Sequence, residues 1–300
     1  YDSAGLAVMQ PSEAFATHKA VGKLSALHEV LEGGVPSGVL GLGHTRWATH
    51  GQPNVSNAYP HLDCAGRIAV VQNGIVENYS TLKSELVARG HRFLSQTDTE
   101  VIPHLIEEWI DAGLGLEDAV RRMLGATKGA LALLVASARH PGTMVAVRNG
   151  NAGGLVIGLG QGETFVASDL PALVPLTSSV MFMNAGEVAV LTADEVQLTT
   201  LNGESVDRAA ADVVQNPMTA AKGEFKHFMQ KEMMHQAVTA RSLDALIRGT
   251  KSRRSVLAPP DPPRSTPTNR TFSPLFSAPR ARYRIFARTP PIASEPGSEL

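Results

Sequence analysis

The chain has 300 residues, 43% of them hydrophobic, with 27 Lys and Arg against 28 Asp and Glu. No run of about 18 consecutive apolar residues occurs, and the first residues lack the basic-then-apolar pattern of a secretory signal. The one cysteine, Cys64, has no partner within the chain for a disulfide, which is typical of a reducing compartment. We therefore expect a cytoplasmic protein of about two domains, with neither membrane nor nucleic acid as a partner.

Residues 251–300 differ in composition from the rest of the chain. They hold 9 Lys and Arg against 3 Asp and Glu, a net charge of +6, together with 10 of the 19 prolines. Proline removes backbone donors and fixes φ, so we expect a disordered Pro/Arg/Ser-rich tail. Three origins remain open: a basic arm for nucleic acid, a proline-rich ligand for a partner groove and, as the preferred one, the product of a shifted reading frame.

Before the tail, short apolar runs alternate with helical patterns. In chain order the predicted elements are a strand at Gly5–Met9, a helix at Val21–Leu31, strands at Val39–Gly43 and Ile68–Val71, a helix at Tyr79–Arg89, a helix from Thr97, a helix at Leu116–Leu124, and strands at Ala130–Ala136, Met144–Val147, Leu155–Ile157, Thr164–Ala167, Val180–Met183 and Val188–Leu191. The segment TDTE at 97–100 fits a capping box for its helix. This order of elements indicates an α+β fold with layered sheets, not a doubly wound parallel sheet.

Two motifs that suggest a cofactor or a metal have simpler explanations. The glycines of Gly158–Gly162 lack the GxGxxG spacing, and a strand pattern follows where a phosphate site needs a helix N-terminus, so a hairpin loop is favoured. His44, His50, His61 and Cys64 match no common zinc spacing. We therefore predict no cofactor and no metal site.

Polar residues gather where predicted strands end. Arg46 lies in the segment GHTRWATHG at 43–51, and its planar fork suits a carboxylate, although a well-capped loop is the simpler interpretation. Asn73-Gly74 is either a turn or an oxyanion hole made of a side-chain amide and a backbone N–H. Asp98 either caps its helix or pairs with a ligand's ammonium group. These residues suggest an amino-acid site with acyl-transfer chemistry and leave the nucleophile unnamed.

Several motifs, in one order, resemble a known family. These are YDSAG at 1–5, HTRWATHG at 44–51, QNGIVENY at 72–79, TDTEV at 97–101 and EFKHFMQKEM at 224–233. They are similar to the N-terminal glutaminase domain, a class-II glutamine amidotransferase, of glutamine:fructose-6-phosphate aminotransferases (isomerizing), also called glucosamine-6-phosphate synthases. The resemblance implies an N-terminal-nucleophile hydrolase fold, α+β, with two antiparallel sheets between helical layers (αββα).

The resemblance also implies a role for each motif residue. Arg46 binds the carboxylate of glutamine, Asp98 holds its ammonium group, and Thr49 and His50 line the site. Asn73 and the Gly74 amide form the oxyanion hole, and Trp47 gates the path of ammonia. In this family an N-terminal cysteine attacks the glutamine amide, and ammonia passes to a second part that converts fructose 6-phosphate to glucosamine 6-phosphate.

The chain departs from the family pattern at both ends. The cysteine-bearing first strand is not among its residues, and Cys64 cannot replace it because it has no free α-amine. Tyr59 and Gln72 stand where histidines are usual, which affects local packing. We expect a glutaminase domain at 1–222 lacking its first strand, the start of an interdomain linker at 223–250, and the tail at 251–300.

These departures predict that the 300 residues catalyse neither half reaction. Fructose 6-phosphate is a partner only through isomerase domains outside this chain, and the full-length relatives are expected to be homodimers in the cytoplasm. The rival interpretations are another class-II amidotransferase, a non-catalytic glutamine-binding pseudo-amidotransferase, and a random open reading frame.

Overall fold

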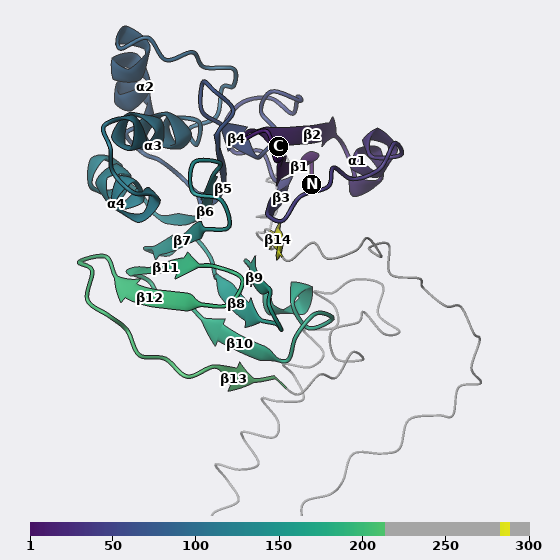
Figure 1. The fold of residues 1–300 in the computed structure, drawn as a ribbon. Coiled ribbons are helices and arrows are strands. Elements are labelled where there is room, and N and C mark those ends of the chain that lie inside the picture. Colours follow the sequence, from purple (N-terminus) through teal and green to yellow (C-terminus); the bar gives the residue numbers. More distant parts are fainter. Residues whose placement is uncertain (214–282, 289–300) are drawn as a thin grey trace, which may run out of the picture. The chain divides into compact units, whose positions relative to one another are not determined.

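Two β-sheets dominate the part of the chain that the computed structural model describes, residues 1–213 and 283–288 (Figure 1). The eight-stranded sheet has the order β13 (Ala211–Asp212), β10 (Ser179–Phe182), β8 (Val156–Leu159), β9 (Thr164–Ala167), β14 (Tyr283–Arg288), β3 (Gly41–Arg46), β1 (Ser3–Met9) and β2 (Phe15–Val21). The six-stranded sheet has the order β12 (Val196–Thr200), β11 (Glu187–Leu191), β7 (Met144–Asn149), β6 (Leu131–Ser137), β5 (Ile68–Gly74) and β4 (His61–Leu62). All neighbours except those of β14 pair antiparallel.

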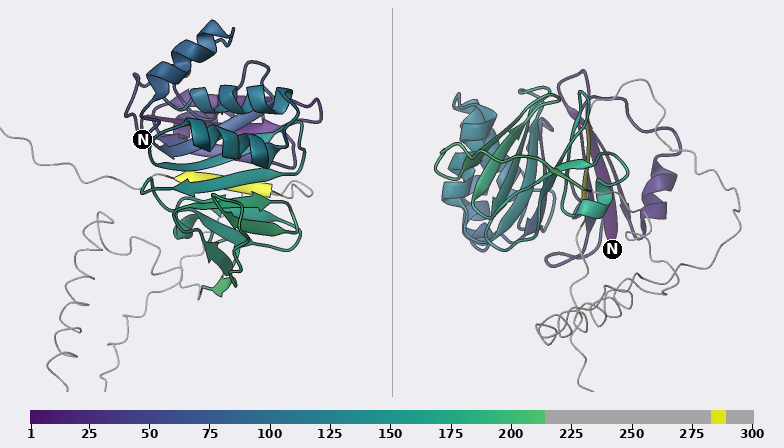
Figure 2. Two further views of the ribbon diagram at one scale, coloured as in Figure 1. Left: turned by 90° about the vertical axis from the view of Figure 1, so that its left-hand side faces the viewer. Right: turned by 90° about the horizontal axis from the view of Figure 1, so that it is seen from below.

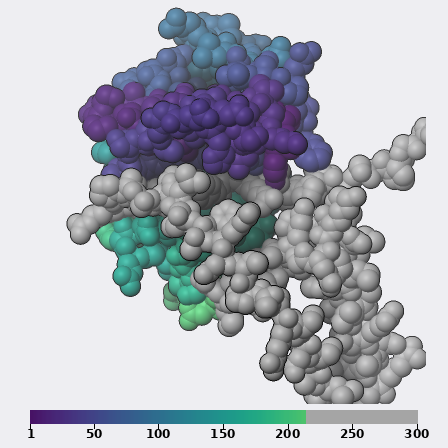
Figure 3. Space-filling model, turned by 90° about the vertical axis from the view of Figure 1, so that its right-hand side faces the viewer, coloured from purple at the N-terminus to yellow at the C-terminus, as the bar shows by residue number. Residues whose placement is uncertain are grey.

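The helices lie on the outer faces of the two sheets (Figure 2). They are α1 (Leu24–Val30), α2 (Tyr79–Ala88), α3 (Val101–Asp111), α4 (Leu116–Ala126) and the 3₁₀ turn η1 (Leu170–Ala172). Helices α2 to α4 cover the six-stranded sheet, whereas α1 packs on β1 and β2 through Leu27, Ala4 and Ala20. Residues 1–50 form a continuous band on the face drawn in Figure 3. None of the helices in the described part is both long and apolar enough to cross a membrane.

Strand β5 shows how the sequence builds these layers. Its side chains point alternately to the two faces of the sheet, as the period of two requires. Ala69 and Val71 pack in the core between the sheets, and Ile68 and Val70 pack against the helices. Both faces of β5 are buried, which explains its continuous apolar run.

Most elements expected before the tail are present, and strands β2, β4, β12 and β13 are additional to them. Strand β2 was not expected, because its sequence FATHKAV mixes polar and apolar residues without a clean pattern. The capping box predicted at Thr97 is wrong. Helix α3 begins at Val101, and the Glu100 carboxylate instead accepts hydrogen bonds from the N–H groups of Leu94 and Ser95, each at 2.7 Å.

Strand β14 lies within the segment predicted to be disordered. Residues 283–288 pair in parallel with β3 on one side and β9 on the other. They read YRIFAR, a proline-free stretch in a proline-rich segment, so every residue can donate to a ladder. These six residues form a strand within the segment for which disorder was expected. The linker predicted at 223–250 and the rest of the tail lie outside the described residues.

Candidate active site

Three polar groups lie at the ends of neighbouring elements. Arg46 ends β3, Asn73 and Gly74 end β5, and Asp98 lies three residues before α3. Arg46, Asn73 and Asp98 are buried, with 3%, 9% and 2% of their surfaces exposed. Buried polar side chains require partners, so their contacts show what holds each group in place.

The guanidinium of Arg46 is held by backbone carbonyls of its own loop. Its Nη2 donates to the carbonyls of His50 and, at 3.1 Å, Gly51. Its Nη1 lies 3.6 Å from Oδ1 of Asp2 and makes no hydrogen bond within the described residues. Arg46 is thus fixed by one nitrogen while the other keeps donors for a carboxylate.

Asn73 is oriented by a neighbouring strand. The Nε2 of His44 on β3 lies 3.2 Å from Oδ1 of Asn73. Burial lowers the pKa of His44 to about 4, so the ring is neutral at neutral pH. An amide oxygen only accepts, so Nε2 carries the proton and donates it, which defines Nδ2 as the donor side of the Asn73 amide.

Gly74 occupies a position that only glycine fits. Its φ is +128°, and a Cβ added to it would lie 2.0 Å from the carbonyl oxygen of Ala130. The backbone at the end of β5 therefore runs directly against its neighbour. An amide aimed from this point needs no side chain and tolerates none.

The carboxylate of Asp98 is joined to the same strand end. Its Oδ2 accepts a hydrogen bond from the N–H of Val76, two residues beyond Gly74, at 2.7 Å. The start of the α3 segment is thereby attached to the chain leaving β5. The position of Asp98 and that of the Asn73-Gly74 pair are thus coupled by one short hydrogen bond.

Tyr59 connects the three groups. Its ring stacks on His44 with centroids 4.4 Å apart, and its hydroxyl lies 2.6 Å from Oγ1 of Thr99. Burial and then the charge of Asp98 raise the pKa of Tyr59, whereas the charge of Arg46 lowers it. Tyr59 therefore contacts His44, two residues before Arg46 on β3, and Thr99, the residue after Asp98.

The remaining residues of the loop after β3 are less enclosed. Thr49 is exposed, and Trp47 has 49% of its surface exposed. His50 is half-buried, and its ring meets that of Tyr79 edge-on with centroids 5.7 Å apart. None of these residues lines the cleft of about 410 Å³ near Thr164 and Arg208, which is a separate feature.

Three supporting residues were not predicted from the sequence as parts of the site. Asp2 pairs with Arg46 and accepts a hydrogen bond from the N–H of Ala48, which fixes the start of the loop. His44 was considered only as a metal ligand, and Tyr59 only as a packing difference. The alternation of side chains along β3 could have indicated His44, because it places His44 and Arg46 on the same face of the strand.

The neighbours of Cys64 in the structure differ from the histidines considered with it in the sequence analysis. It approaches His91, His104 and Glu107, rather than His44, His50 or His61. In sequence these partners lie far from Cys64 and belong to the segment before α3 and to α3 itself. The arrangement is a second polar cluster beside the candidate active site.

Comparison with known proteins identifies the relatives of this arrangement. The family model for the glutamine amidotransferase domain matches residues 31–207. A glutamine–fructose-6-phosphate aminotransferase (isomerizing) of Thermus thermophilus is 49% identical over 236 residues, covering 79% of this chain and 38% of that protein. The enzyme of the same name from Methanothermobacter thermautotrophicus is 42% identical over 241 residues, covering 80% and 40%. The chain thus spans about two fifths of the length of these relatives.

A solved structure gives the same result for the fold. The allosteric regulatory enzyme of purine biosynthesis is 25% identical, with a TM-score of 0.55, covering 67% of this chain and 43% of that one. The α+β fold of N-terminal-nucleophile amidotransferases, with two sheets between outer helices, is therefore confirmed. The parallel pairing of β14 is the one feature that the expected pair of antiparallel sheets did not include.

Proposed function

Because the chain belongs to the glutamine amidotransferase domain family, we propose that it is the glutamine-binding and glutamine-hydrolysing part of a glutamine:fructose-6-phosphate aminotransferase. The observation that supports this proposal is a chain of contacts: Asn73 is bonded to His44, His44 is stacked on Tyr59, and the Tyr59 hydroxyl bonds Thr99 beside Asp98. A cation, a donor pair and an anion at the ends of separate elements match the carboxylate, amide and ammonium groups of glutamine.

Each group has a distinct part in the proposed recognition. The guanidinium of Arg46 binds the α-carboxylate, and the carboxylate of Asp98 pairs with the α-ammonium group. Both are charge-assisted contacts in a buried setting, where they are stronger than neutral hydrogen bonds. Thr49 and His50 line the site from the loop after β3, and the exposed Trp47 stands at its edge as the gate for ammonia.

The donors at the end of β5 serve the chemical step. When a nucleophile attacks the amide carbon, negative charge develops on the amide oxygen, and the Asn73 amide with the Gly74 N–H stabilises it. The family nucleophile is an N-terminal cysteine with its own amine as base. The 300 residues contain one cysteine, Cys64, at an internal position, so we expect these residues alone to bind glutamine without hydrolysing it.

Transfer to the sugar belongs to the parts of the relatives that this chain does not cover. Fructose 6-phosphate would be used there, with ammonia delivered from the glutamine site, in a homodimeric cytoplasmic enzyme. The single cysteine is consistent with a reducing compartment. The glutamine site itself can be tested without these parts.

The test is binding of small ligands by calorimetry. Glutaric acid monoamide lacks the α-amine, so Asp98→Asn should weaken glutamine binding about tenfold to hundredfold while leaving the monoamide unchanged. Arg46→Lys should weaken both ligands. In Asp98→Asn an amide oxygen still accepts from Val76, so the local fold is kept. Arg148→Lys is the control, since Arg148 also bonds backbone carbonyls, those of Gly153 and Met183.

Hydrolysis provides the second part of the test. Glutamate release should be absent from the 300-residue chain and appear when a Cys-initiated strand of the family is added before Tyr1. Equal turnover by the two proteins would refute the assignment of the nucleophile. Equal loss of both ligands in Asp98→Asn would refute the assignment of Asp98.

A further inference from the structure

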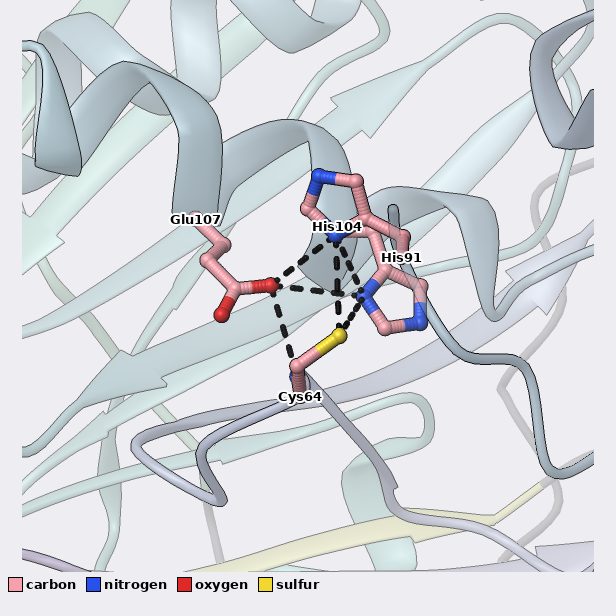
Figure 4. Close-up of side chains that lie close together, drawn as sticks. All are labelled: Cys64, His91, His104 and Glu107. Atoms are coloured by element: carbon pink, nitrogen blue, oxygen red, sulfur yellow. Dashed lines mark hydrogen bonds and ion pairs between the residues drawn. The ribbon is translucent and has the colours of Figure 1, made fainter. Parts of the chain in front are cut away.

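Four side chains from three segments turn toward one point beside α3 (Figure 4). They are Cys64 after β4, His91 after α2, and His104 and Glu107 on α3. One ligand atom from each residue lies within 4.8 Å of the others. His104 and Glu107 are three residues apart on one helix, so they share a face by helical periodicity.

Five of the six separations between these atoms have the lengths of the edges of a small tetrahedron, and the sixth, from the Sγ of Cys64 to the Oε2 of Glu107, is within 4.8 Å. The two Nδ1 atoms of His91 and His104 are 3.3 Å apart, and the Oε2 of Glu107 lies 3.2 and 3.4 Å from them. The Sγ of Cys64 lies 3.7 Å from His91 Nδ1 and 3.6 Å from His104 Nδ1. Zinc bonds of ordinary length imply tetrahedral edges of about 3.3 Å between nitrogen or oxygen ligands and about 3.6 Å from sulfur to nitrogen.

The outer nitrogens of both imidazoles face carboxylates. His91 Nε2 lies 3.2 Å from Oε1 of Glu108, which Arg89 in turn binds through Nε at 2.6 Å. His104 Nε2 is buried, lies 3.9 Å from Oε1 of Glu100 and makes no hydrogen bond within the described residues. A carboxylate behind a metal-binding histidine holds the proton on the outer nitrogen and leaves the inner one to bind metal.

This distribution of protons leaves no imidazole proton among the ligand atoms, and the Oε2 of Glu107 accepts one backbone hydrogen bond, from the N–H of Cys64 at 3.3 Å. With protons on both Nε2 atoms, the two Nδ1 atoms and the Glu107 oxygen present only lone pairs to one another. The backbone N–H of Arg92 donates to the Cys64 sulfur at 3.4 Å. Four electron-rich atoms at such distances repel unless a cation lies among them.

We propose that Cys64, His91, His104 and Glu107 form a tetrahedral Zn²⁺ site. One thiolate and one carboxylate neutralise the two charges of the ion, and the mixture of sulfur, nitrogen and oxygen suits zinc. Since the protein supplies all four ligands, the site is structural and leaves no position for a substrate. It ties the loop after β4 and the segment after α2 to α3.

This inference departs from the sequence-based expectation of no metal. The ligands are separated by 26, 12 and 2 residues in the sequence, which is not a zinc-finger spacing. Only the packing of α3 against the loop after β4 brings them together. The site is also independent of the proposed glutamine chemistry, because neither Arg46 nor Asp98 takes part.

The test is the metal content of the purified 300-residue chain without a histidine tag. We expect one zinc per chain after dialysis, and with Co²⁺ the visible absorption of tetrahedral cobalt together with a thiolate-to-cobalt charge-transfer band. Cys64→Ser should abolish that band, and His91→Asn should reduce the bound zinc. His28→Asn, at an exposed histidine of α1, is the matched control and should retain the full content.

The affinity for zinc should also depend on Glu108, whose carboxylate lies behind His91. Glu108→Gln should weaken zinc about tenfold to hundredfold in competition with a chromophoric chelator. Glu117→Gln on α4 is its control and should bind zinc as the unaltered chain does.

A folded chain that holds no zinc at micromolar Zn²⁺ would overturn the proposal, and so would cobalt spectra without the charge-transfer band. In that case a proton shared by His104 and Glu107 holds the cluster together. If Cys64→Ser does not fold, the spectrum of the unaltered chain decides, because Cys64 is its only thiol.

Discussion

The Nε2 of His44 lies 3.2 Å from Oδ1 of Asn73, and this contact joins β3 to β5 inside the candidate active site. The two side chains are 5% and 9% exposed. A hydrogen bond in such a setting orients the acceptor amide as well as stabilising it. His44 therefore acts as a positioning residue for the proposed oxyanion hole.

Replacing His44 by Phe should keep the ring stack on Tyr59 and remove the donor to Asn73. We expect a loss of about 1–2 kcal/mol in the free energy of unfolding, because a buried oxygen loses a partner. Urea unfolding measures it. In an Asn73→Leu background the same change should cost less, and an equal cost in both backgrounds would contradict the coupling.

Because His44 is buried as a neutral ring, we expect the protein to lose stability in acid. Folding lowers its pKa from 6.5 to about 4, mainly through burial among Tyr59, Asn73, Arg46 and Asp2. The unfolded chain then binds the proton more tightly, so stability is complete above about pH 6.5 and falls as the pH approaches 4. Between pH 6.5 and 5 the contribution is about 1–2 kcal/mol.

The measurement is the urea midpoint as a function of pH in the unaltered chain and in His44→Phe. The variant should show a shallower decline over this interval. Parallel curves would mean that other groups account for the acid sensitivity. His28→Asn serves as the control, since His28 is exposed on α1.

The fold could be predicted from the sequence where the hydrophobic period was clear. The run at Ile68–Val71 and the helix expected at Tyr79–Arg89 correspond to β5 and α2. Strand β2 could not be predicted, because Thr17 and Lys19 interrupt its apolar pattern. It forms a strand because it pairs with β1. Strand β14 is the extreme case, since its neighbours lie far away in the sequence.

The candidate site could also be predicted only in part, because the sequence shows local motifs but not contacts between distant segments. Motifs at strand ends indicated Arg46, Asn73 and Asp98, since each carries its chemistry in a short segment. The residue that joins them, Tyr59, comes from a separate loop, and only packing brings its ring onto His44. The cluster around Cys64 depends even more on packing, because three segments contribute to it.

The ion pair between Arg208 and Glu187 should stabilise the start of β11 in the six-stranded sheet. Arg208 Nη2 lies 2.6 Å from Oε1 of Glu187, whose side chain is 8% exposed, and hydrogen bonding to Arg208 keeps the pKa of that carboxyl below its ordinary value. Arg208→Met leaves the acid without its cation. We expect a loss of about 1–3 kcal/mol by urea unfolding.

The control for this change is Arg139→Met. Arg139 and Asp111 are equally close, 2.6 Å, but their side chains are 35% and 50% exposed. An exposed pair contributes about 0–1 kcal/mol, so this variant should be nearly neutral. Equal losses in the two variants would show that burial of Glu187 is not the deciding factor.

Gly74 should tolerate no side chain. The variant Gly74→Ala tests this, with Gly66→Ala as its control. Both glycines have positive φ, +128° and +70°, but an added Cβ at Gly74 meets the Ala130 oxygen at 2.0 Å, whereas at Gly66 it meets nothing within 4 Å. We expect about 3 kcal/mol of destabilisation at Gly74 from strain plus overlap, and about 1 kcal/mol at Gly66 from strain alone. Thermal and urea unfolding measure both. Similar losses at the two positions would mean that backbone conformation alone, and not the close approach to Ala130, requires glycine at the end of β5.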